Sequence, residues 1–109
     1  MYTEDQETIV GFIERFHGSE DVFLHGCCWW FAQILVQRFG WMASVKYEPV
    51  EGHFVTRIIN RYYDVRGDVT ELYRTKRMYD MTKLRIEDRR MYDRLMRQCR
   101  DFEEAGAWE

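Results

Sequence analysis

The chain has 109 residues, of which 46% are hydrophobic, 17% aromatic and 32% charged, and its formal net charge is −3. This size and this apolar content predict a single domain over residues 1–109 with its own hydrophobic core, and they exclude a disordered chain. The negative charge argues against a nucleic-acid partner, and no apolar run approaches the roughly 18 residues that cross a membrane.

The cysteines and the first residues indicate a reducing compartment. Three cysteines, two of them adjacent, do not make a disulfide framework. The segment 1–5 is acidic and lacks the pattern of a signal peptide. We therefore expect a cytoplasmic protein.

A first helix is predicted over residues 4–17. Thr3 and Gln6 fit a capping box, and apolar residues follow at helical spacing. Gly18 is a natural helix end, so residues 18–26 are expected to form a loop.

A second helix is predicted over residues 28–39, and Gly40 closes it. Its only polar residues are Gln33, Gln37 and Arg38. Because only a narrow stripe of this helix can face water, it should lie in the middle of the domain, with Cys28 at its N-terminal end.

Strands are predicted over residues 43–50, 53–59 and 62–65, where β-branched and aromatic residues concentrate. The last two flank Asn60, which predicts a hairpin, and Gly67 is expected to end the strand that follows the turn.

A charged helix with an apolar stripe is predicted over residues 83–104, and the segment 74–82 is either a loop or a short helix. The order of elements predicts an α+β fold. In this fold, a small antiparallel sheet of about three strands packs on a buried central helix that bears the cysteine, flanked by N- and C-terminal helices.

Three residues in this order carry the parts of an activated thiol: Cys28, His53 and Asp64. A base takes the thiol proton, an acid orients the base, and a helix N-terminus favours the thiolate. Cys27 is the rival nucleophile, because it lies one residue earlier. Cys28 is favoured, since its spacing from the apolar residues of the second helix directs it toward the sheet.

The hairpin register decides whether the base and the acid can meet. A two-residue turn at Ile59-Asn60 opposes Val55 to Asp64 and leaves His53 diagonal to Asp64 on the same face. A three-residue loop would put them on opposite faces. The triad therefore needs a two- or four-residue connection, or a bulge, and we expect one of these.

The segment Cys28-Trp29-Trp30-Phe31-Ala32 resembles the active-site segment of papain-like cysteine peptidases. A histidine that opens a strand, followed by a hairpin into Tyr62-Tyr63-Asp64-Val65-Arg66-Gly67, is more similar to the transglutaminase-like and compact bacterial branches of that superfamily. The resemblance covers about residues 24–70. It implies a papain-like domain in which Cys28 is the nucleophile, His53 the base and Asp64 the orienting acid.

The resemblance does not identify the hydrogen-bond donors of the oxyanion hole. The glutamine that papain-like enzymes carry before the nucleophile has no counterpart, since Val22 and Phe23 stand there. Backbone N–H groups of Cys27 or Cys28, or the side chain of His25, are the candidate donors. A fold of this size also resembles small proteins encoded by phages and mobile elements, and the catalytic domains of bacterial toxins.

Three other patterns have simpler readings. His25, Cys27 and Cys28 could join His53 or His17 at a zinc ion, but their spacing fits no common zinc motif. The arginines of the last helix alternate with acids, which is typical of a solvated face. The tryptophans are most simply part of the hydrophobic core, although an indole ring beside the thiol could form one wall of a substrate-binding cleft.

The sequence therefore predicts a cysteine-dependent hydrolase or acyl transferase that acts on a peptide, isopeptide or amide bond through Cys28, His53 and Asp64. We expect it to need no cofactor or metal and to take a protein or peptide as its substrate. The alternative is a non-catalytic interaction protein, of the inhibitor or immunity type, on a degenerate hydrolase fold.

Overall fold

The computed structural model describes residues 2–18, 20 and 28–104, with side chains described at 6–18, 20, 28–40 and 42–97. Its elements along the chain are α1 (Tyr2–Ile13), the short 3-10 helix η1 (Glu14–Phe16), α3 (Cys28–Phe39), the 3-10 helix η2 (Gly40–Met42), β1 (Ala43–Glu48), β2 (His53–Ile58), β3 (Arg61–Asp64), β4 (Gly67–Asp68), α4 (Thr70–Tyr73), β5 (Tyr79–Asp80), α5 (Met81–Glu87) and α6 (Arg89–Glu104). No helix of this part of the chain is both long enough and apolar enough to span a bilayer.

The fold is α+β with an antiparallel sheet, as predicted. The sheet has five strands in the order β4-β3-β2-β1-β5, and every neighbouring pair is antiparallel. The three predicted strands correspond to β1, β2 and β3. The edge strands β4 and β5 have only two residues each, which is too short for an alternating pattern to reveal them, so the prediction of about three strands was wrong.

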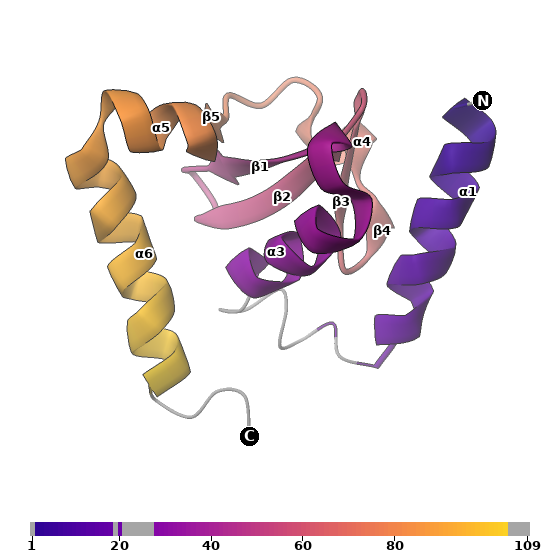
Figure 1. Ribbon diagram of the computed structural model, residues 1–109, viewed down its shortest axis with the longest axis horizontal. Coiled ribbons are helices and arrows are strands. Elements are labelled where there is room, and N and C mark those ends of the chain that lie inside the picture. The colour runs from indigo at the N-terminus through magenta and orange to yellow at the C-terminus, as the bar shows by residue number, and fades with distance from the viewer. Residues whose placement is uncertain (1, 19, 21–27, 105–109) are drawn as a thin grey trace.

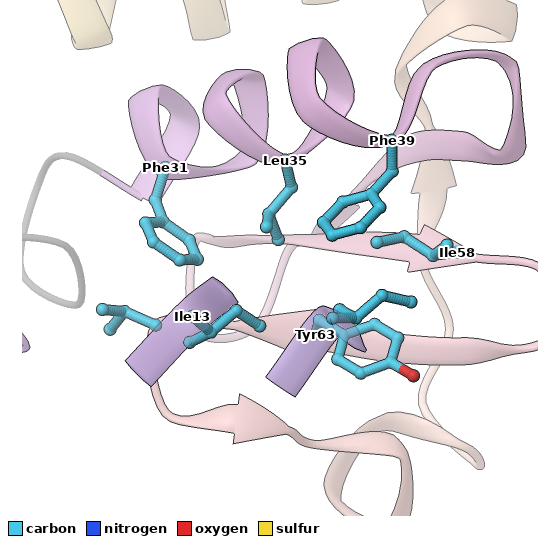
Figure 2. Close-up of a cluster of buried hydrophobic side chains, with 8 residues drawn as sticks. Ile13, Phe31, Leu35, Phe39, Ile58 and Tyr63 are labelled. Carbon is cyan, nitrogen blue, oxygen red and sulfur yellow. The ribbon is translucent and has the colours of Figure 1, made fainter. Parts of the chain in front are cut away.

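Helix α3 packs against β1, β2 and β3 and supplies much of the core. Figure 2 shows Phe31, Leu35 and Phe39 directed from this helix toward Ile58 and Tyr63 of the sheet. Ile9 and Ile13 of α1 belong to the same buried cluster. The apolar residues of α3 recur at spacings of three and four, which is why one face of the helix can cover the sheet.

A second apolar cluster joins the other side of α3 to the C-terminal helices. It consists of buried side chains from α3, from two neighbouring strands and from α5 and α6: Cys28, Ala32, Val45, Phe54, Met81, Leu84 and Leu95. In Figure 1, α1 and α6 lie at opposite sides of the domain, with α3 between them.

The predicted C-terminal helix over 83–104 is two helices. Asp88 interrupts it with φ −142° and ψ 76°, and its carboxylate accepts a hydrogen bond from the backbone N–H of Met91 at 3.1 Å. Asp80 caps α5 in the same way through the N–H of Lys83. Both aspartates stabilise new helix starts, because a side-chain acceptor satisfies an N–H without an intrahelical partner.

The loop between β2 and β3 is the two-residue turn that the register argument requires. Ile58 pairs with Arg61, so Ile59 and Asn60 form the turn. Ile59 has φ +62°, and of these two residues it alone has a positive φ, as in a type II′ hairpin. Its N–H donates to the carbonyl of Met42 at 3.2 Å, which helps to hold this strained residue.

Candidate active site

The imidazole of His53 and the carboxylate of Asp64 are in contact at one end of the sheet. His53 opens β2 and Asp64 ends β3. The distance from His53 Nε2 to Asp64 Oδ2 is 2.9 Å, and the two residues are only 6% and 3% exposed. The two-residue turn brings them together, because the register opposes Val55 to Asp64 and leaves His53 diagonal to it.

Cys28, the first residue of α3, lies on the buried face of the helix, as its spacing predicted. Its side chain is close enough to the His53 ring to raise the pKa of that ring. Because Nε2 faces Asp64, Nδ1 is the ring nitrogen left for the thiol. The structure therefore brings the three predicted residues together in the order thiol, imidazole, carboxylate.

The surroundings favour the charged form of the histidine. Burial acts to lower the pKa of His53, but the hydrogen bond to Asp64 and the nearby Cys28 outweigh it and raise this pKa from 6.5 to about 9. The ring is therefore an imidazolium at neutral pH. Its Nε2–H donates to the carboxylate, which fixes the orientation of the ring.

Asp64 is held in its ionised form by partners on two sides. Burial acts to raise the pKa of this carboxyl, but the hydrogen bonds from His53 and Arg66 outweigh it and lower the pKa below its ordinary value. A carboxylate buried to this degree needs such partners, because an unpaired buried charge is strongly unfavourable.

Arg66 is a site residue that the sequence analysis did not single out. Its Nη2 donates to Asp64 Oδ2 at 2.6 Å, and its Nε lies 3.2 Å from Asp64 Oδ1. Its backbone N–H also donates to Asp64 Oδ1 at 2.8 Å. Asp64 and Gly67 are paired across this tight turn, and Gly67 has φ +107°. The Asp-x-Arg-Gly pattern of an Asx turn was the signal that could have found it.

A second group of polar side chains extends from Arg66 to the surface. Arg66 Nη2 donates to Tyr73 Oη at 3.3 Å, and Tyr73 Oη donates to Glu51 Oε1 at 2.8 Å. Lys76 Nζ donates to the other oxygen of Glu51 at 3.0 Å. Burial and the bond to Glu51 raise the pKa of Tyr73 to about 12, so its hydroxyl stays protonated. Its ring centroid is 6.0 Å from that of His53.

Tyr73 belongs to α4, a four-residue helix that the sequence analysis did not predict. Gly67 was expected to end the strand that carries the acid, whereas it opens β4. The chain therefore turns back beside Asp64 and carries α4 next to the site. This return explains how residues distant in sequence surround the histidine.

The rival nucleophile and the zinc alternative involve residues that the structure does not describe. Cys27 and His25 both lie outside the described residues. Among the described residues, no three His, Cys, Asp or Glu side chains converge as ligands for a metal ion. Of the candidate oxyanion donors, the backbone N–H of Cys28 lies at the start of α3, where helix N–H groups lack intrahelical partners.

Comparison with known proteins supplies one family. The family model of the phage YunG-like protein matches residues 6–102, a span that contains Cys28, His53 and Asp64. No curated protein and no solved structure matches the chain. The chain therefore belongs to the phage YunG-like family.

Proposed function

We propose that this member of the phage YunG-like family is a cysteine-dependent hydrolase or acyl transferase that acts on a peptide, isopeptide or amide bond. The contact between His53 and Asp64, with Cys28 beside the ring, is the observation that carries the proposal. Buried thiol, imidazole and carboxylate in this order are the parts of a nucleophile, its base and the group that orients the base.

In the proposed reaction, the proton of Cys28 already rests on His53 before the substrate binds, and the sulfur attacks the carbonyl carbon as the thiolate. His53 then donates the proton to the leaving amine, the carbon–nitrogen bond breaks, and a thioester remains on the sulfur. Water or an acceptor amine attacks the thioester, with His53 as the base. The carbon–sulfur bond breaks, and the cycle ends with the thiolate of Cys28 beside the protonated His53.

The neighbouring groups have supporting roles in this scheme. Asp64 stabilises the imidazolium that forms, and Arg66 holds Asp64 in the orientation that the ring needs. The N–H of Cys28 is the donor that we assign to the developing oxyanion, because it lies at the N-terminus of α3.

The rate of alkylation by iodoacetamide as a function of pH tests the proposal. Because His53 would hold a proton beside the sulfur, Cys28 should be alkylated at neutral pH much faster than the thiol of glutathione. Mapping the modified peptide by mass spectrometry separates Cys28 from Cys27 and Cys99. The His53→Ala variant should react only as an ordinary thiol does.

The matched control is His17→Ala, because His17 is an exposed histidine whose described partner is Glu20. It should leave the alkylation profile unchanged. A profile for the wild type that coincides with that of glutathione, and that does not respond to His53→Ala, would refute the proposal. Full biological activity of a Cys28→Ala variant would instead favour the non-catalytic interaction protein.

A further inference from the structure

We infer that the groove between α3 and the C-terminal helices binds the acyl segment of the substrate, and that this segment carries an apolar side chain and a carboxylate. The inference rests on the proposed function, since it assigns a binding site to the same thiol. It names a class of substrate, an acidic and apolar peptide, that the triad by itself does not select.

The groove is a cleft of about 270 Å³. One wall is the stripe Trp29, Gln33 and Val36 of α3, the floor is the start of β1, and the opposite wall comes from α5 and α6. This volume is slightly below the range of about 300–1,000 Å³ that is typical of sites for small molecules. It therefore suits one or two amino-acid side chains better than a cofactor.

The wall of the groove on α3 starts at Trp29, one residue after Cys28. Trp29 follows Cys28 directly, and its ring lies edge-on to Phe54, the neighbour of His53, with 5.2 Å between the ring centroids. Two lining residues, Val45 and Met81, belong to the same buried cluster as Cys28. A peptide whose carbonyl lies at the sulfur could therefore place a side chain against the apolar surface that Trp29, Val45 and Met81 contribute to the groove.

The direction of the groove sets how far the acidic group lies from the reacting carbon. The stripe from Trp29 to Val36 covers seven residues of helix, or about 10 Å at 1.5 Å per residue. An extended peptide advances about 3.3 Å per residue, so two to three residues span that length. The groove is therefore long enough for two to three substrate residues, and the test peptides below carry their acidic group on the third.

Among the described residues, Arg85 of α5 is the only charged one that lines the groove. Among the side chains that the structure describes, it pairs with no carboxylate. Two acids of the neighbouring elements are already paired, since Asp80 binds Lys46 at 2.6 Å and Asp93 binds Arg89 at 3.0 Å. The guanidinium of Arg85 is therefore available to bind a carboxylate of the substrate.

Two thiol-reactive peptides of equal length test this inference: acetyl-Glu-Leu-Leu chloromethyl ketone and its neutral isostere acetyl-Gln-Leu-Leu chloromethyl ketone. The readout is the ratio of their alkylation rates at Cys28, located by peptide mapping. We expect the glutamate reagent to react about fivefold faster, as for one partly solvated ion pair. The ratio should fall toward one in high salt, because salt screens such a pair.

Variants of Arg85 should change this ratio in a defined order. Arg85→Gln should bring it to one, and Arg85→Glu should bring it below one. Arg90→Glu makes the same change in net charge at an exposed position that does not line the groove, so it should leave the ratio near fivefold. A wild-type ratio of one, or equal effects of the two charge reversals, would overturn the inference.

The two proposals fail in different ways in this experiment. Plain iodoacetamide reports on Cys28 and His53 alone, because it is too small to reach Arg85. If its rate does not depend on His53 while the peptide ratio still depends on Arg85, the proposed function is wrong and the groove remains a peptide site. If the iodoacetamide rate depends on His53 while the peptide ratio does not depend on Arg85, the groove inference is wrong and the proposed function stands.

Discussion

The middle of α3 and its N-terminal end are both buried against the sheet, but different forces hold them there. Leu35 in the middle is 0% exposed and lies among apolar side chains (Figure 2). Cys28 at the end is 8% exposed and lies beside His53, which in turn binds Asp64. Apolar contacts are not directional, whereas each buried charge needs its own partner. Loss of one partner should therefore lower the free energy of unfolding more at the N-terminal end of α3 than in its middle.

The largest effect on stability is expected from Asp64→Asn. The amide cannot neutralise the imidazolium of His53 or the guanidinium of Arg66, which both bind this carboxylate. Removal of one member of a buried ion pair should lower the free energy of unfolding by about 4 kcal/mol. Chemical denaturation measures this change.

The control for this substitution is Asp93→Asn, which breaks an exposed pair with Arg89 on α6. It should cost less than about 1 kcal/mol. Equal effects of the two substitutions on the free energy of unfolding would show that the pairing of Asp64 with His53 and Arg66 does not stabilise the protein.

Leu35→Ala should lower the free energy of unfolding by about 3 kcal/mol, because it leaves a cavity in the apolar cluster. Gln37→Ala, an exposed position of the same helix, should change it by no more than about 0.5 kcal/mol. The fraction of Leu35→Ala that remains folded should keep the wild-type iodoacetamide profile. A changed profile would mean that the two ends of α3 are not independent.

Stability should also depend on pH through His53. Its pKa is raised from 6.5 to about 9 on folding, so the stabilisation is fully present below pH 6.5 and is lost as the pH rises through about 9. We expect the free energy of unfolding to fall by about 3 kcal/mol over this interval. Denaturation curves of the wild type and of His53→Gln check this, because the variant should lack the decline.

The smallest effect is expected from Arg66→Gln. Its guanidinium is partly exposed, so solvent screens the pair with Asp64, and the loss should be about 1 kcal/mol. Arg74→Gln, which breaks the exposed pair with Glu71, should have almost no effect. If Arg66 positions Asp64, its loss should also change the pH profile of Cys28 alkylation, which a merely structural arginine would not do.

The elements that could be predicted are those with a long or regular pattern. The helix from Cys28 to Phe39 repeats apolar residues over three turns, and β2 and β3 carry β-branched and aromatic residues on both sides of a short turn. The register of the β2–β3 hairpin then followed from the number of residues in the turn, because side chains alternate between the two faces of a strand. That count located His53 and Asp64 on one face.

The elements that could not be predicted are short or depend on distant residues. β4, β5 and α4 have too few residues for a period to emerge, and the break at Asp88 depends on one capping carboxylate. Tyr73, which binds Arg66, was missed for the same reason, since it reaches the site only through the turn at Gly67.

Local spacing alone therefore determined which helix is buried, which of its faces carries Cys28, and that the histidine and the acid belong to neighbouring strands. Only the tertiary structure decided that the imidazole meets both the thiol and the carboxylate, that Arg66 pairs with this carboxylate, and that Trp29 and Arg85 line the same groove. The physical reason is that periodicity records burial, whereas the pairing of charges depends on how separate elements approach one another in space.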